Sequence, residues 1–220
     1  RRVLFRSASD QTIYEDMYGK SYASMKDVKL AGWTREDVDK VVTPEPVANC
    51  LHSVKLMVER IVQESGADEW VGYITGGGNY RDTIDATKKY KGNRDTTHKP
   101  TWYKEIKEYL LKYQKGLTVE GMEADDMLGI EQRRLHKERG DWEGSIICSM
   151  DKDMDCIPGW HYNWKKESKY FVKEKDATRH IYTQVLTGDS TDNIDGLKGI
   201  GPKKAEKALS GCDTEEELYM

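Results

Sequence analysis

The chain has 220 residues, of which 37% are hydrophobic and 34% charged, and its formal net charge is −4. This length fits one large domain, or one domain with a small appendage, and the hydrophobic share is sufficient for a core. The composition excludes a protein that is basic throughout. No apolar run reaches the ~18–20 residues that cross a bilayer, so we expect neither a membrane segment nor a secretory signal.

Cysteine spacing and the two chain ends give further expectations. Four cysteines form no CxxC pair and no zinc-like spacing with the five histidines, which favours reduced thiols in a cytosolic protein. Residues 1–7, RRVLFRS, differ in character from the rest and are expected to be a non-native leader before a natural sequence that begins near Ala8. We interpret the chain as a fragment that lacks natural sequence at both ends.

Hydrophobic periodicity predicts the secondary structure, and glycines and prolines mark where elements end. In chain order we expect loops with short helical pieces over 8–45, a helix over 46–65, a strand over 70–75, a helix over 100–113, a strand over 117–119, a helix over 123–139 that Gly140 ends, a strand over 145–149, shorter strands over 161–164 and 169–172, and a helix over 176–186 capped by Asp176. Strands that alternate with helices predict an α/β fold with a mostly parallel sheet covered on two faces.

Carboxylates collect at three points where a predicted strand or loop leads into a helix. Each group alone has an ordinary explanation, because acidic residues complement a helix dipole and aspartates are common in turns. The three groups are Glu123 with Asp125 and Asp126, Asp151 with Asp153, and Asp189 with Asp192.

Taken together, the three groups predict a metal site. The carboxyl ends of parallel strands and the starts of the following helices lie along one edge of a sheet, so these side chains are expected to meet. Unpaired carboxylates would raise one another's pKa by repulsion. Two divalent cations about 3.5–4 Å apart remove that repulsion and can clamp a phosphodiester, and Mg²⁺ prefers such oxygen ligands.

Two basic elements accompany the acidic groups. Ten Lys and Arg residues against five Asp and Glu residues lie between Arg81 and Lys115, which is typical of a track for a polyanion; the alternative is a solvated helix face. Residues 196–209, GLKGIGPKKAEKAL, predict a helix-hairpin-helix, in which flexible glycines and Pro202 begin a helix whose N–H groups grip a phosphate. The alternative there is an ordinary loop between two helices.

Five motifs stand in order between Tyr73 and Leu209: Asn79-Tyr80-Arg81, Tyr90-Lys91-Gly92-Asn93-Arg94, Gly121-Met122-Glu123-Ala124-Asp125-Asp126, Ser149-Met150-Asp151-Lys152-Asp153, and Thr187-Gly188-Asp189-Ser190-Thr191-Asp192-Asn193. This ordered set resembles the 5′-nuclease family, which includes flap endonucleases, the 5′→3′ exonuclease domains of bacterial repair polymerases and tailed-phage 5′→3′ exonucleases. The phage branch is the most similar.

The resemblance implies a PIN-like α/β core over residues 8–187, with a mostly parallel twisted sheet flanked by helices and a basic arch at about 81–115. It also implies a helix-hairpin-helix DNA-binding region over 188–220. Two Mg²⁺ or Mn²⁺ ions and a K⁺ ion at the hairpin are the implied cofactors. The implied metal ligands are Glu123, Asp125, Asp126, Asp151, Asp153, Asp189 and Asp192; the implied catalytic residues are Arg81, Tyr90, Lys91 and Arg94; the implied DNA-binding residues are Lys88, Lys89, Lys91, Arg94, Lys198, Gly199, Gly201, Lys203 and Lys204.

The chain departs from the family pattern at two metal ligands. The family's first metal aspartate lies on an N-terminal strand, and no such segment is present in this sequence. The family often has an aspartate at the end of the strand before the Asn-aromatic-Arg motif, where this chain has Thr75 and Gly76. The resemblance therefore implies that this chain is weakly active or inactive as it stands, even if its parent is an enzyme.

The resemblance implies a Mg²⁺-dependent phosphodiesterase that acts on DNA near 5′ ends or flaps, as a monomer in the cytoplasm of a bacterial host if a phage encodes it. Two alternatives remain open at this point. One is a ribonuclease of the same fold that removes RNA primers. The other is a DNA-binding relative that has lost catalysis through a degraded metal site.

Overall fold

The computed structural model describes residues 10–84, 88–93, 99–212 and 214–219. Those residues divide into two compact units. The first contains 10–59 and 99–114, and the second contains 60–84, 88–93, 115–212 and 214–219. The proposed leader over 1–7 lies outside the described residues, and a division at residue 188 stays a prediction.

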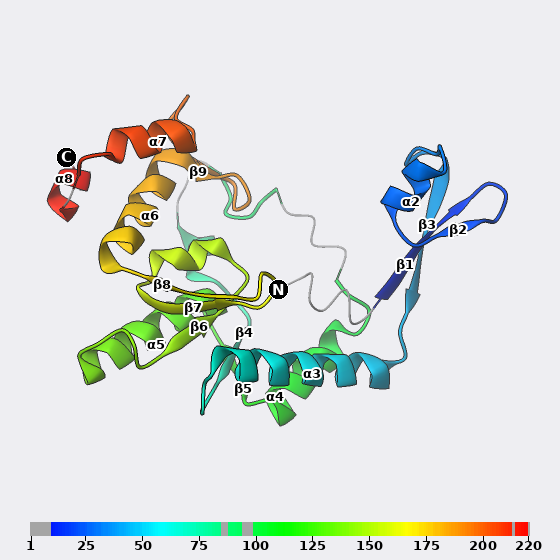
Figure 1. Cartoon of the computed structure of the whole chain (residues 1–220), viewed down its shortest axis with the longest axis horizontal. Helices are drawn as coiled ribbons and strands as arrows, with labels where there is room; N and C mark the ends of the chain where they lie inside the picture. The colour runs from blue at the N-terminus through cyan, green and yellow to red at the C-terminus, as the bar shows by residue number, and fades with distance from the viewer. Residues whose placement is uncertain (1–9, 85–87, 94–98, 213, 220) are drawn as a thin grey trace. The chain divides into compact units, whose positions relative to one another are not determined.

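An antiparallel sheet with the order β2-β1-β3 forms the start of the first unit (Figure 1). Its elements are β1 (Asp10–Asp16), β2 (Ser21–Tyr22), α2 (Met25–Leu30) and β3 (Val38–Pro44). The expectation of loops with short helical pieces over 8–45 is therefore wrong. The buried Asp16 carboxylate organises the β1–β2 turn, because it accepts hydrogen bonds from the Tyr18 and Lys20 amides at 3.0 Å and from the Tyr22 hydroxyl at 2.8 Å.

Two helices complete the first unit, and both were predicted. They are α3 (Val47–Ser65), whose last residues belong to the second unit, and α4 (Tyr103–Tyr113). Cys50, Val54 and Ile106 are fully or almost fully buried between them. Burial of apolar side chains of this size stabilises the fold by roughly 1.5–3 kcal/mol each. The helical spacing of apolar residues in the sequence corresponds to this contact between α3 and α4.

Strand pairing in the second unit is parallel in two places. β4 (Gly72–Thr75) pairs with β5 (Gly116–Val119), and β6 (Ile146–Cys148) pairs with β7 (Gly159–Asn163). β8 (Ser168–Val172) returns antiparallel to β7. The α/β class is confirmed, whereas the mostly parallel sheet is wrong in extent: the parallel pairs belong to separate small sheets among the described residues.

The helices of the second unit pack on these strands and on one another. They are η1 (Tyr80–Thr83), α5 (Ala124–Arg139), η2 (Lys152–Cys156), α6 (Glu174–Thr187), α7 (Pro202–Leu209) and α8 (Glu215–Tyr219), with the short strands β9 (Gly188–Asp189) and β10 (Ile194–Asp195) after α6. Leu128 of α5 packs against Ile147, Met154 and Ile157, which form the core of this unit. Gly140 ends α5 in the left-handed conformation, with φ 80°, as predicted.

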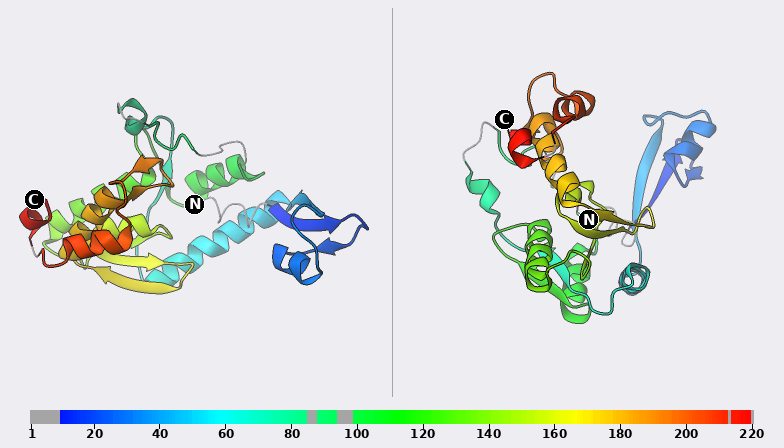
Figure 2. Two further views of the ribbon diagram at one scale, coloured as in Figure 1. Left: turned by 90° about the horizontal axis from the view of Figure 1, so that it is seen from above. Right: turned by 60° about the vertical axis from the view of Figure 1, so that its left-hand side comes forward.

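α6 begins two residues earlier than predicted. Its N-cap is Lys173, so Asp176 lies inside the first turn, and the prediction that Asp176 caps the helix is wrong. α7 packs on α6 (Figure 1 and Figure 2), where the Arg179 guanidinium donates to the carbonyls of Leu209 at 2.8 Å and Cys212 at 2.7 Å. All four cysteines are unpaired. None of the helices in the described ranges has the length and hydropathy to cross a bilayer.

Candidate active site

The start of helix α5 lies beside the end of strand β4. The buried N–H of Ala124, in the first turn of α5, donates to Thr75 Oγ1 at 3.1 Å. The Asp126 carboxylate accepts a hydrogen bond from the Glu123 amide at 2.9 Å. These two bonds satisfy N–H groups that a helix start leaves without intrahelical partners, and they hold Glu123 at the N-cap position.

A three-glycine turn leads from β4 into η1. The Gly77 amide donates to the Glu120 carboxylate at 2.7 Å, and a Cβ at Gly76 would lie 2.2 Å from the same carboxylate. Gly78 has φ 69°, a left-handed conformation that glycine adopts without a steric penalty. The left-handed backbone favours glycine at position 78, and the turn brings Asn79 and Arg81 to the start of α5.

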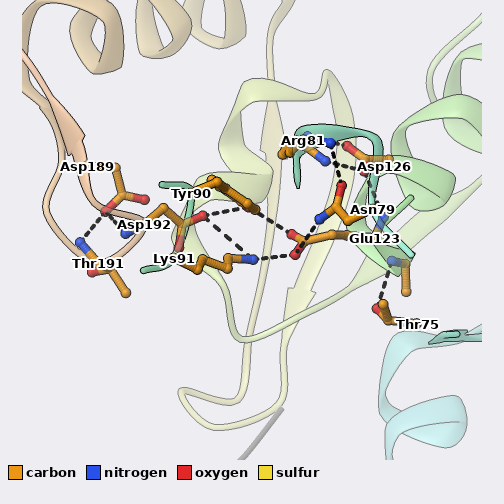
Figure 3. Close-up of polar contacts among 11 residues, drawn as sticks. Thr75, Asn79, Arg81, Tyr90, Lys91, Glu123, Asp126, Asp189, Thr191 and Asp192 are labelled. Atoms are coloured by element: carbon orange, nitrogen blue, oxygen red, sulfur yellow. Dashed lines mark hydrogen bonds and ion pairs between the residues drawn. The ribbon is translucent and has the colours of Figure 1, made fainter. Parts of the chain in front are cut away.

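Arg81 forms a two-pronged ion pair with Asp126, with N–O distances of 2.6 and 2.7 Å (Figure 3). This pair is the main reason that the pKa of the Asp126 carboxyl lies below its usual value. The Asn79 side-chain amide donates to Glu123 Oε1 at 3.3 Å. The Asn-Tyr-Arg motif thus supplies a neutral donor and a cation to the two acidic residues that flank the start of α5.

Lys91 and Tyr90 bridge the start of α5 to the loop after α6 (Figure 3). The Lys91 ammonium pairs with Glu123 and lies 3.7 Å from Asp192 Oδ2. The Tyr90 hydroxyl donates to Asp192 at 2.8 Å and contacts Glu123 at 3.2 Å. Burial, followed by the hydrogen bond to Asp192, raises the pKa of Tyr90 far above its usual value, so its phenol remains a proton donor.

A second acidic group forms around η2. Asp151 follows β6 and accepts the Asp153 amide at 3.0 Å, while Gln184 of α6 donates to Asp153 Oδ1 at 2.8 Å. Burial raises the pKa of Asp153, and the negative charges of Asp151 and Asp189 raise it further. Asp153 therefore feels the charge of Asp151, which precedes η2, and of Asp189 in β9.

The loop that carries Asp189 and Asp192 is fixed by a backbone crossing. Gly188 has φ 68°, and a Cβ there would lie 2.2 Å from the Gly196 amide nitrogen. Asp189 Oδ1 accepts the Thr191 amide at 2.8 Å. Because no side chain fits at the crossing, the glycines let the chain turn back, and the loop that follows brings Asp192 to Tyr90.

The structure brings most of the predicted site residues into two neighbouring groups within the second unit. One group is a continuous set of polar contacts, and the other consists of Asp153 with the two aspartates whose charges raise its pKa. The first contains Arg81, Tyr90, Lys91, Glu123, Asp126 and Asp192; the second contains Asp151, Asp153 and Asp189. Asp125 is partly buried in the first turn of α5, and Arg94 lies outside the described residues.

The predicted DNA-binding residues after the site lie at the exposed start of α7. Lys198, Gly199, Gly201, Lys203 and Lys204 are all exposed there. Pro202 occupies the first turn of α7, Gly199 has φ 80°, and the Lys204 ammonium donates to the Gly199 carbonyl at 2.8 Å. Lys88 and Lys89 are exposed on the segment before Tyr90, where Lys88 pairs with Asp195 at 2.7 Å.

The carboxylate oxygens of the site suit hard divalent cations, but the two groups of carboxylates have different surroundings in the structure. The negative charges of Asp151 and Asp189 raise the pKa of Asp153, and a cation beside Asp153 would offset that repulsion. Glu123 and Asp126 already pair with Lys91 and Arg81. Within the residues that the structure describes, no group of three His, Cys, Asp or Glu side chains is arranged to hold a metal ion. An ion at Glu123 or Asp126 therefore has to exchange with these basic side chains.

Four site residues are not among the predicted ones, and all of them carry side-chain amides. Asn79 contacts Glu123, Gln184 contacts Asp153, and Asn93 and Asn193 contact backbone carbonyls across the site. Three of the four lie inside motifs identified in the sequence, so their position in a motif could have marked them as site residues. Gln184 lies in the middle of α6, and its role depends on a contact that helical spacing does not reveal.

Replacing Thr75 with valine is expected to destabilise the protein by about 1 kcal/mol. Valine keeps the shape and the β-branched character of threonine, but it removes the oxygen that accepts the Ala124 amide. Urea unfolding monitored by circular dichroism measures the change. Thr118→Val, on an exposed position of the paired strand β5, is the matched control; equal destabilisation of both variants would show that Thr75 is not a cap.

Comparison with curated proteins gives relatives among 5′→3′ exonucleases, while no family model matches the chain. A 5′-3′ exonuclease of Buchnera aphidicola subsp. Acyrthosiphon pisum is 33% identical over 117 residues, which cover 48% of this chain and 39% of that protein. A 5′-3′ exonuclease of Mycoplasma pneumoniae is 25% identical over 191 residues, covering 79% of this chain and 64% of that protein. The DNA polymerase I of Deinococcus radiodurans is 34% identical over 110 residues, which are 45% of this chain and 11% of the polymerase.

Solved structures of bacteriophage T5 proteins share the fold. A T5 protein co-crystallised with metal ions aligns with a TM-score of 0.59 and 19% identity, over 76% of this chain and 70% of that one. A T5 flap endonuclease in a complex with DNA and metal ions aligns with a TM-score of 0.55 and 20% identity, over 72% and 65% of the two chains. The resemblance to 5′-nucleases, stated from the motifs, is confirmed. This chain spans between about four tenths and two thirds of the length of the curated exonucleases above.

Proposed function

We propose that this chain carries the catalytic core of a metal-dependent 5′→3′ DNA exonuclease or flap endonuclease. One observation carries the proposal: the basic Tyr90-Lys91 segment, the acidic start of α5 and the acidic loop after α6 meet in a single contact network. In the sequence, Glu123 lies roughly 30 residues after the Tyr90-Lys91 segment, and Asp192 lies roughly 100 residues after it. Carboxylates that would hold metal ions, next to cations that would offset charge on the phosphate, are a combination that supports phosphodiester hydrolysis.

Lys91 is the residue to which we assign the contact with the scissile phosphate. Its ammonium pairs with Glu123 and lies 3.7 Å from Asp192, beside carboxylates that would hold the metal ions. A fixed cation there stabilises the negative charge that builds up as water adds to phosphorus and the bond to the 3′ oxygen breaks. We assign Arg94 the same role, Arg81 a further phosphate contact, and Tyr90 a stacking surface for a base.

Two Mg²⁺ or Mn²⁺ ions are the proposed cofactors. One would be held by Glu123, Asp125, Asp126, Asp151 and Asp153 after release of Lys91 and Arg81, and the position of the other would be completed by Asp189 and Asp192, partly through water. When bound, such ions supply positive charge that offsets the charge developing on the phosphodiester. The T5 structures with this fold contain metal ions, which supports a metal requirement in this chain.

We propose that DNA is the substrate and that a PIN-like core and a helix-hairpin-helix act on it together. The N–H groups at the start of α7, with Lys198, Lys203 and Lys204, would grip a duplex phosphate without reading sequence, and a K⁺ ion would bind the hairpin carbonyls. Lys88 and Lys89 would extend the contact toward the single-stranded 5′ end. The protein would act as a monomer in a bacterial cytoplasm, which suits the bacterial and phage origin of its relatives.

Cleavage of a 5′-labelled flap substrate by the product of the complete reading frame tests this function. In Mg²⁺ we expect release of a short 5′-labelled fragment that ends in a 3′-hydroxyl, with a new 5′-phosphate on the retained strand, and in EDTA we expect no release. A matched duplex with an RNA 5′ segment runs in parallel. Faster removal of RNA than of DNA would make the protein a primer-removing ribonuclease, and Mg²⁺-independent binding without cleavage of either substrate would make it a non-catalytic DNA-binding protein.

A further inference from the structure

Two loops of the second unit, about a hundred residues apart in sequence, are fastened to each other. We call residues 88–93 the basic loop and residues 188–195 the acidic loop. Lys91 on the basic loop donates its backbone N–H to the Asp192 carbonyl of the acidic loop at 2.9 Å. Backbone pairing of this kind fixes the position of the chain at Lys91, independently of where its side chain points.

Two asparagines reinforce this contact in a reciprocal manner. The Asn93 side-chain amide, on the basic loop, donates to the Ser190 carbonyl at 2.8 Å. The Asn193 side-chain amide, on the acidic loop, donates to the Lys89 carbonyl at 2.9 Å. Each loop thus caps a carbonyl of the other, and the two bonds flank the backbone pair at Lys91 and Asp192.

The backbone conformations at the contact point to the same conclusion. Lys91 has φ 53° and Asn193 has φ 62°. Asparagine adopts this left-handed region more readily than most residues, whereas a lysine does so only at a steric cost. The surrounding bonds offset that cost, and from this position the Lys91 ammonium pairs with Glu123 and lies 3.7 Å from Asp192.

We propose that Asn93 and Asn193 are positioning residues that clip the basic loop onto the acidic loop and hold Lys91 over the carboxylates. This inference rests on the proposed function for the role of Lys91. The clip forms without substrate, so the lysine is already in place when a phosphate arrives. Preorganisation of this kind lowers the activation barrier more than it increases affinity for the substrate.

Asn193→Gly and Asn93→Ala test the clip. Glycine at 193 keeps the left-handed backbone and removes only the amide donor. We expect the Lys91 amide to exchange its hydrogen about tenfold faster in either variant, as measured by NMR. On the flap substrate, kcat should fall by about 10- to 100-fold with little change in KM, because a misplaced catalytic group slows the reaction at a nearly constant affinity.

A double-substitution cycle separates positioning from general stability. In the Lys91→Ala background, Asn193→Gly should lower kcat no further, because the clip acts only through Lys91. Asn163→Gly is the matched control: its side chain caps the Lys165 and Lys166 amides in the β7–β8 turn, so it should reduce stability without slowing Lys91-dependent cleavage. Additive losses in the cycle, or unchanged exchange at the Lys91 amide, would overturn the proposal. If the protein cleaves nothing, the exchange measurement still decides whether the clip exists.

Discussion

Substitution of Lys91 by alanine should reduce the single-turnover rate on a 5′-flap substrate by about 10²–10³-fold, the usual cost of removing one group that stabilises a developing oxyanion. Affinity for the same DNA should fall only a few fold, because one lysine among many phosphate contacts supplies a small share of the binding energy. The expected difference rests on the proposed contact of the Lys91 ammonium, beside Glu123 and Asp192, with the reacting phosphate.

Rapid-quench cleavage and fluorescence anisotropy measure the two quantities on one substrate. Binding is measured with Ca²⁺ in place of Mg²⁺, so that cleavage does not interfere. Lys137→Ala removes an exposed lysine from the last turn of α5, outside the site, and should change neither quantity. A parallel fall in rate and affinity for Lys91→Ala would refute its role in the transition state and leave it as one phosphate contact among others.

Asp151→Ala should abolish Mg²⁺-dependent cleavage, with a loss of about 10³-fold or more. Metal ions contribute several kcal/mol to charge stabilisation in phosphoryl chemistry, and each 1.36 kcal/mol is a tenfold change in rate. Asp151 stands at the carboxyl end of β6, where its charge contributes to the raised pKa of Asp153. Loss of that charge should also weaken Mn²⁺ binding, which isothermal titration calorimetry measures without reference to activity.

Asp151 also caps η2, since its side chain accepts the Asp153 amide at 3.0 Å, so a second variant has to separate the two roles. Asp151→Asn retains the accepting oxygen and removes the charge, and it should be as inactive as the alanine variant. Asp176→Ala, in the exposed first turn of α6, controls for the loss of a carboxylate. An active asparagine variant would show that Asp151 supports the loop and that the metal ligands lie elsewhere.

The sequence predicted the elements whose signal is local and strong. The apolar spacing of α3 and α4 reports the burial of Cys50, Val54 and Ile106, and Gly140 marks the end of α5. It failed for β1–β3, because their sheet has a small core of Tyr22, Val28 and Val38 and most other positions are polar. The Thr12-Ile13-Tyr14 run before the Tyr18-Gly19 turn was a hairpin signal that weak periodicity obscured.

The sequence indicated which residues belong to the candidate site, but it did not indicate which side chains pair with one another. The spacing of the acidic groups indicated that Glu123, Asp126 and Asp192 belong together. Glu123 and Asp192 do meet, at Tyr90 and Lys91, but through the antiparallel β9–β10 loop and not along one parallel sheet edge. Spacing does not determine which cation faces which carboxylate, and the Arg81–Asp126 pair depends on the three-glycine turn after β4. The contacts of Asn93 and Asn193 with distant carbonyls depend on how two loops meet, which no local pattern encodes.

The pairing of Lys91 with Glu123 and of Arg81 with Asp126 has a consequence for how the protein tolerates chelators. At the start of α5, the charges of these two ion pairs cancel. Basic side chains of the protein therefore act as the counterions of Glu123 and Asp126. Its folded state does not depend on an external ion to offset those two carboxylates, unlike a small zinc domain that unfolds when its metal is removed. Removal of divalent ions by a chelator should therefore abolish cleavage without unfolding the protein, and adding the ions back should restore cleavage.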